Sequence, residues 1–112
     1  DVEGVYFTAH FHEDVVESPL GKKFLELFKK ETGKELDSYT AQAGDAYFVL
    51  IDAINRAGST NPEKIRDEIV KTKDFMGITG KITMKPDGNA IKAMVVNKVK
   101  DGKFEYVTTI MP

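Results

Sequence analysis

The chain contains no cysteine among its 112 residues, which excludes disulfide bonds, a thiolate nucleophile and metal centres built on sulfur. It also lacks an excess of positive charge, since 16 Lys and Arg residues stand against 18 Asp and Glu residues. We therefore expect neither nucleic-acid binding nor attraction to anionic membranes. Its longest apolar runs, such as Ala46–Ile51, are far shorter than the ~20 residues that cross a bilayer.

The remaining composition is that of a globular protein, with 41% hydrophobic and 30% charged residues, and the length suits one compact unit. The sequence begins at Asp1 without a basic and apolar leader, and Val5–Ala9 already has the composition of a buried strand. We expect either that a signal peptide has been removed or that the chain is a piece of a longer protein, and the early strand favours the second.

Apolar spacing and capping residues predict three helices after this strand. The first runs over residues 19–32, with Ser18 as N-cap and Gly33 as the stop. The second ends at Gly58, and the third begins after Asn61 and ends near Thr72. On the second helix an apolar stripe is predicted to face the core, formed by Ala43, Ala46, Tyr47, Leu50, Ile51 and Ile54.

The last third of the chain changes to the period of β-strands. Residues 80–84 and 92–100 are predicted strands, and Asp101-Gly102 predicts a two-residue hairpin turn into a strand over residues 103–110. A strand, three helices and then C-terminal strands with a hairpin predict the α/β fold class.

No cluster of residues predicts catalysis. His10 and His12 would share one face of an extended strand and could offer two imidazoles to a metal, but no third ligand can be named, so a polar loop is the favoured interpretation. Residues 77–81 lack the spacing of a phosphate loop and predict a turn. Asp45 and Asp52 fall on a similar helix face, where Asp45 is expected mainly to favour the helix dipole.

Tyr39 is a candidate for ligand contact because it stands between a polar connector and a helix that begins with small residues. An aromatic side chain there could line a cleft with its ring and its hydroxyl. The alternative, which spacing alone favours, is that the ring folds over the domain's own core.

The order of segments resembles the C-terminal portion of the branched-chain amino acid binding proteins of bacterial ABC transporters, a family of type I periplasmic binding proteins. The resemblance covers essentially all 112 residues. The segments that carry it are Gly4–Thr8, Lys22–Phe24, Thr32–Glu35, Tyr39, Gly44–Ala46, Asp52–Thr60, Ile65–Asp67 and Phe75–Ile82.

This resemblance implies a partial type I periplasmic-binding-protein fold. Whole receptors of the family are several times longer and have two α/β lobes joined by hinge crossovers. Residues 1–91 would belong mostly to the N-terminal lobe, and residues 92–112 would form the hinge crossover and the return strands of the other lobe.

The resemblance also implies function: capture of an amino acid or similar solute outside the cytoplasm, in the periplasm, and its transfer to a membrane permease, with no catalysis, cofactor or metal. The groups that hold the amino acid's carboxylate and ammonium lie upstream of this segment in the family. Tyr39 matches the aromatic residue that lines the ligand side-chain pocket, and His10 and Phe11, near the hinge end of a strand, are weaker ligand-binding candidates.

Two other hypotheses remain open. The chain could be a stand-alone interaction or dimerisation module without a small-molecule site, and an enzyme would require a metal at His10 and His12. Open strand edges predict self-association, with possible exchange of the C-terminal hairpin.

Overall fold

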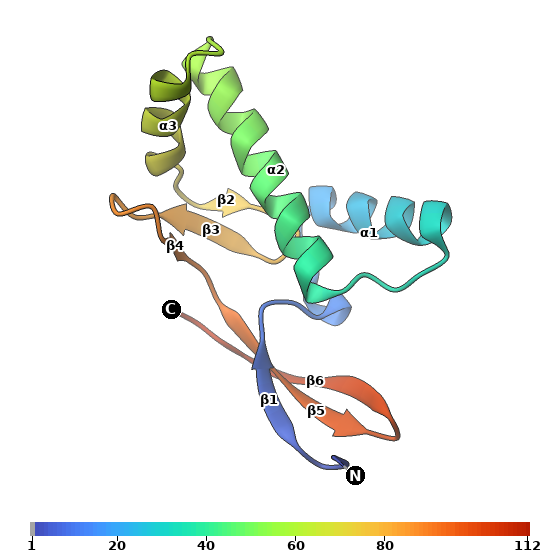
Figure 1. The fold of residues 1–112 in the computed structure, drawn as a ribbon. Helices are drawn as coiled ribbons and strands as arrows, with labels where there is room; N and C mark the ends of the chain where they lie inside the picture. The colour runs from blue at the N-terminus through green and yellow to red at the C-terminus, as the bar shows by residue number, and fades with distance from the viewer. Residues whose placement is uncertain (1) are drawn as a thin grey trace.

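The computed structural model describes residues 2–112, and Figure 1 shows its helices gathered at one end and a three-stranded sheet at the other. The N-terminal half carries a short strand, a single 3-10 turn and three helices: β1 (Tyr6–Ala9), η1 (Glu13–Val15), α1 (Pro19–Thr32), α2 (Ser38–Ala57) and α3 (Pro62–Val70). The C-terminal part is made of strands: β2 (Phe75–Met76), β3 (Lys81–Met84), β4 (Ala90–Ile91), β5 (Met94–Lys100) and β6 (Lys103–Ile110). This order confirms the α/β class and the C-terminal hairpin.

The strands form two separate antiparallel sheets. One has the order β1-β5-β6, in which Phe7 lies opposite Asn97, and the other has the order β2-β3-β4. We call residues 13–91 the helical unit and the three strands β1, β5 and β6 the strand unit (Figure 1). The chain passes between the units twice, at residues 10–12 and at residues 92–93, which we call the first and second crossovers.

Side chains and glycines cap helices α1 and α2. Ser18 Oγ accepts a hydrogen bond from the amide of Gly21 at 2.9 Å, and Gly33 takes a left-handed φ of 67° that stops α1. The Asp37 carboxylate caps α2 by accepting from the amide of Thr40 at 2.8 Å. This hydrogen bond, with others at the same cap, lowers the pKa of Asp37 below its usual value.

The hydrophobic core lies where the first crossover, the start of α2 and the β2–β3 turn meet. Its buried members are Phe11, Leu36, Ala41 and Ile78, and the aromatic rings of α1 pack against them. Gly44 allows this close contact, because a Cβ there would lie 3.2 Å from the Phe24 ring and would displace the end of the Ile78 side chain. The core therefore joins α1, α2 and the β2–β3 turn into one body.

The apolar stripe of α2 does not face this core, so that prediction is wrong for the chain as described. The buried residues of α2 are Ala41, Asp45, Val49 and Ala53. Within the stripe, the Tyr47 side chain is 59% exposed, and Leu50 and Ile51 are also exposed. An amphipathic helix normally buries its apolar stripe, so this face of α2 is left largely uncovered within residues 2–112.

The molecule is also more extended than a compact domain. Its radius of gyration is 15.7 Å, whereas about 13 Å is usual for a compact domain of this length. Its accessible surface is 7550 Å², which exceeds by roughly 1,400 Å² the area of a compact protein of this mass. Large apolar side chains of β1, α2 and β6 are among those exposed.

Candidate functional site

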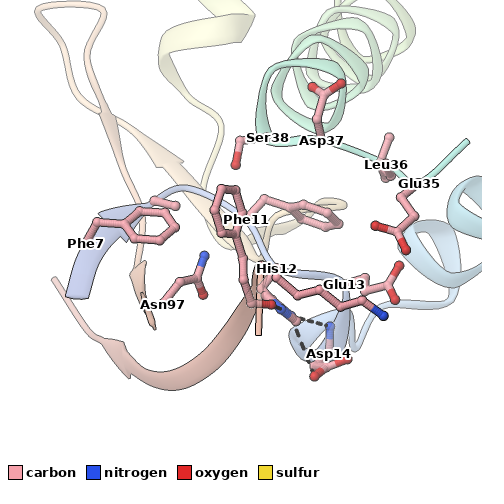
Figure 2. A pocket seen from close by; sticks show the side chains of 14 residues that line it. Phe7, Phe11, His12, Glu13, Asp14, Glu35, Leu36, Asp37, Ser38 and Asn97 are labelled. Carbon is pink, nitrogen blue, oxygen red and sulfur yellow. Dashed lines mark hydrogen bonds and ion pairs between the residues drawn. The ribbon is translucent and has the colours of Figure 1, made fainter. Parts of the chain in front are cut away.

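A cavity of about 540 Å³ opens between the strand unit and the start of α2 (Figure 2), and its volume falls in the range usual for small-molecule sites. We call it the interunit cavity. Its lining comes from β1, the first crossover, the connector before α2, and the β5–β6 hairpin: Phe7, Ala9, Phe11, His12, Glu13, Asp14, Glu35, Leu36, Asp37, Ser38, Asn97, Gly102, Lys103 and Phe104.

Aromatic rings form the apolar wall of the interunit cavity. Phe7 and Phe104 meet edge to face, with ring centroids 4.8 Å apart. Phe11 belongs both to this wall and to the core, and only 5% of it is exposed. The wall therefore connects the strand unit to the core of the helical unit and offers an apolar surface to a ligand.

His12 fixes the polar side of the interunit cavity. Its Nδ1 accepts a hydrogen bond from the amide of Asp14 at 3.1 Å, so the ring proton lies on Nε2, which donates to the carbonyl of Phe104 at 3.0 Å. Figure 2 shows the imidazole held beside Asp14 in this way. The bond to Phe104 ties the first crossover to the hairpin, and the two bonds together leave this ring without a free nitrogen for chemistry.

Asn97 is a buried polar residue in the same lining that the sequence analysis did not identify. It lies on β5 opposite Phe7 and is 2% exposed. Its Oδ1 is buried and has no hydrogen-bond partner among residues 2–112. A polar residue within a strand gives no sequence signal of such a role, because only the fold shows that its amide faces a cavity.

The structure brings one of the three predicted ligand-contact residues into the interunit cavity. Phe11 lines it, whereas Tyr39 is 85% exposed and follows Ser38, the last lining residue of that segment. His10 lies between two lining residues, and its Nδ1 is buried without a hydrogen-bond partner in the described part of the chain. Of the three, Phe11 alone belongs to the lining of the interunit cavity, and Tyr39 and His10 are neighbours of lining residues in sequence.

A second, smaller hollow of about 330 Å³ lies along α2 and β3, and we call it the α2 hollow. Most of its lining is apolar, and the two charged residues in it are Asp45 and Lys92. The lining residues are Gln42, Asp45, Ala46, Val49, Leu50, Ile69, Thr79, Ile82, Met84, Ala90 and Lys92.

Asp45 is a structural anchor, contrary to the expectation that it mainly decorates the helix dipole. It is only 4% exposed, and its carboxylate accepts hydrogen bonds from the amides of Ile78 and Thr79 and from the Thr79 hydroxyl. Asp52, the other carboxylate considered with it, instead pairs with Arg56 at 3.0 Å on the surface of α2. The two carboxylates do not form an acid–base pair.

Residues 77–80 form the predicted turn, closed by a hydrogen bond of 2.9 Å from the Gly77 amide to the Gly80 carbonyl. The backbone amides of Ile78 and Thr79 in this turn donate to the Asp45 carboxylate, whereas the amides of a phosphate loop would donate to a phosphate. The turn therefore serves the contact between α2 and the β2-β3-β4 sheet.

Two kinds of site are missing from the described residues. Nowhere between residues 2 and 112 do three His, Asp or Glu side chains gather closely enough to share a metal ion, and His10 and His12 are no exception. Over the same residues, no helix combines the length and the apolar character needed to span a bilayer.

Comparison with known proteins identifies relatives over almost the whole chain. A sequence model of the family described as periplasmic binding proteins matches residues 1–103. The crystal structure of a leucine binding protein from Thermotoga maritima is 47% identical, with a TM-score of 0.92 over 99% of this chain and 32% of that one. A search of curated proteins returned no match.

Two further crystal structures are similar at lower identity. A branched-chain amino acid transporter substrate-binding protein from Streptococcus pneumoniae, in complex with isoleucine, is 29% identical with a TM-score of 0.85, over 98% of this chain and 31% of that one. An ABC transporter substrate-binding protein from Desulfitobacterium hafniense, complexed with Leu, is 27% identical with a TM-score of 0.85, over 95% and 32% of the two chains. The chain thus spans about a third of the length of these relatives.

Proposed function

Because the chain belongs to the periplasmic binding protein family, we propose that it forms part of an extracytoplasmic receptor that captures an amino acid or similar solute for an ABC transporter. The relatives supply the solute class, since their names and complexes concern leucine, isoleucine and branched-chain amino acids. In this role the chain delivers its solute to a membrane permease and catalyses no reaction.

The exposed apolar surfaces of α2 and of the strand unit support the proposal that the chain is part of a larger receptor. The exposed stripe on α2 and the apolar side chains of the strand unit are surfaces that a folded receptor would bury against its remaining segments. In this proposal the helical unit belongs to one lobe and the strand unit to the other. The resemblance found in the sequence assigns residues 1–91 mostly to one lobe. Because β1 pairs with β5, we propose instead that β1 belongs to the same lobe as the rest of the strand unit.

The observation that carries the ligand site is the interunit cavity, which lies at the junction of the two units and is lined in part by the first crossover. Ligands of two-domain proteins bind preferentially at such domain interfaces. Phe11 contributes to the cavity wall, and Tyr39 stands at the start of α2 with its ring free to contact a ligand. His10, between the lining residues Ala9 and Phe11, is a third proposed contact, since its buried Nδ1 has no hydrogen-bond partner among residues 2–112.

Titration calorimetry of a full-length receptor that carries this segment tests the proposal. We expect heat on addition of leucine, isoleucine or valine, and affinity about tenfold weaker in Tyr39→Ala, because the aromatic contact with the ligand side chain is lost. Tyr6→Ala is the control, since Tyr6 precedes the lining residue Phe7 on β1 and its side chain therefore points to the opposite face of the sheet. Equal affinities in both variants and the parent would remove Tyr39 from the site.

A second candidate function, an interaction module that pairs with a copy of itself, is supported by the free outer edge of β6. This strand pairs only with β5 in its sheet, and Phe104, Val107 and Ile110 are exposed on it. The excess surface of roughly 1,400 Å² exceeds the ~800 Å² that each partner of a stable dimer buries. An antiparallel pairing of two β6 edges, or exchange of the β5–β6 hairpin, would cover it.

Light scattering after size exclusion checks this second candidate. We expect the mass of the 112-residue chain to rise with concentration toward that of a dimer, and Ile110→Lys to shift the equilibrium toward monomer because it places a charge at the paired edge. Thr60→Lys, in the exposed loop before α3, should leave the equilibrium unchanged. A monomer mass at every concentration would contradict self-association.

A further inference from the structure

Lys92 occupies the second crossover, between β4 and β5, where its side chain reaches back to the first crossover. The ammonium donates to the carbonyl of His10 at 3.1 Å and to the carbonyl of Ala93 at 3.3 Å. These two carbonyls belong to the two different segments that connect the helical unit to the strand unit. One charged group therefore binds both connections at once.

The helical unit contributes the third interaction of Lys92. Asp45 of α2 lines the α2 hollow together with Lys92, and its negative charge favours the ammonium. Asp45 is itself fixed to the β2–β3 turn by its hydrogen bonds with Ile78 and Thr79. Lys92 thus lies between the crossovers and a rigid anchor of the helical unit.

Burying the Lys92 ammonium at this position costs free energy that an apolar side chain would not. Burial disfavours the charged form and lowers the pKa of Lys92, and the nearby Asp45 charge only opposes that effect. An apolar side chain of similar length would fill the same space without that cost. What an apolar residue could not supply is the pair of hydrogen bonds to His10 and Ala93.

We propose that Lys92 is a positioning residue that clamps the two crossovers together and thereby sets the angle between the helical unit and the strand unit. Two short connections, each with free backbone rotations, would otherwise allow the units to turn relative to each other. In a receptor the same angle would govern how readily the lobes close on a solute, a consequence that rests on the proposed function.

The angle can be measured without any ligand. Because the chain has no cysteine, Lys64→Cys on α3 and Thr108→Cys on β6 give two unique sites for nitroxide labels, one on each unit. Pulsed electron resonance then reports the distribution of distances between the units. In Lys92→Met we expect a broader distribution with a shifted mean, because the hydrogen bonds between the crossovers are lost while the side-chain volume is kept.

Two variants separate positioning from general stability. Lys92→Arg keeps charged donors within reach of the His10 carbonyl and should restore a narrow distribution. Lys100→Met, at the far end of β5 from the second crossover, loses only an exposed ion pair with Glu105 and should match the parent. An unchanged distribution in Lys92→Met, or broadening of equal size in Lys100→Met, would overturn the proposal.

Hydrogen exchange provides a second measurement that does not depend on the labels. Amides of residues 10–12 and 93–95 should exchange faster in Lys92→Met, while amides within α2 keep their protection. If protection is lost equally throughout the chain, Lys92 acts on stability alone and the proposal fails. In a full-length receptor the two proposals can fail separately. If Lys92→Met broadens the distance distribution while the unsubstituted receptor binds no amino acid, the proposed function is contradicted and the positioning role of Lys92 stands.

Discussion

Replacing Asp45 by alanine should lower the free energy of unfolding of the chain by about 3–5 kcal/mol, because the buried amides of Ile78 and Thr79 lose a charged acceptor. The Thr79 hydroxyl loses its partner at the same time. These donors belong to the turn that holds the β2-β3-β4 sheet against α2, so the loss also loosens the contact between two elements. Urea unfolding followed by circular dichroism measures the change.

Asp52→Ala is the matched control on the same helix. Asp52 pairs with Arg56 at the surface, where an exposed ion pair contributes about 0–1 kcal/mol. Asp45→Asn should fall between the two alanine variants, since its amide oxygen can still accept from one backbone amide. If Asp45→Ala and Asp52→Ala destabilise the chain equally, the carboxylate does not anchor the turn.

The helices were predictable because their signals are local. Ser18 and Gly33 bracket α1, and Gly58 ends α2 with a left-handed φ, as the residue types predict. The two-residue strand β2 was missed because so short an element has no periodicity to read. Caps and turns depend on contacts within a few residues, so they can be predicted from the local sequence.

Which face of α2 is buried could not be predicted in the same way. Periodicity identified an apolar stripe that includes Tyr47 and Leu50, but it cannot tell whether the segment that covers a stripe lies within the same 112 residues. The helix buries its opposite face, with Val49 and Asp45, against elements of this chain. In the proposed receptor, segments outside residues 2–112 would cover this stripe.

The site depended on contacts between residues far apart in sequence. Asp45 lies more than thirty positions from the amides that it binds, and Lys92 lies 82 positions from the His10 carbonyl. Nothing at either position in the sequence distinguishes it from an exposed charge. Resemblance to a family identified Phe11 near the junction of the units, and physical reading of the sequence alone did not.

Asp45 also makes a glycine necessary at position 77, and this leads to the second prediction of large effect. A Cβ on Gly77 would lie 2.9 Å from the Asp45 Cγ and 3.1 Å from the Ile82 side chain, closer than such atoms approach without movement. The carboxylate cannot turn away, because that would break its bonds to the amides of the turn. We expect Gly77→Ala to lower the free energy of unfolding by about 2–3 kcal/mol.

A double-mutant cycle distinguishes this steric conflict from a general sensitivity of the turn. When Asp45 is already alanine, the carboxylate atoms that the new methyl group would strike are absent and only the 3.1 Å approach to the end of the Ile82 side chain remains, so Gly77→Ala should then cost less than about 1 kcal/mol. The two substitutions together would therefore destabilise the chain by clearly less than the sum of their separate effects. Strict additivity would mean that Gly77 is needed for its backbone alone, and that the Asp45 carboxylate does not determine the shape of the turn.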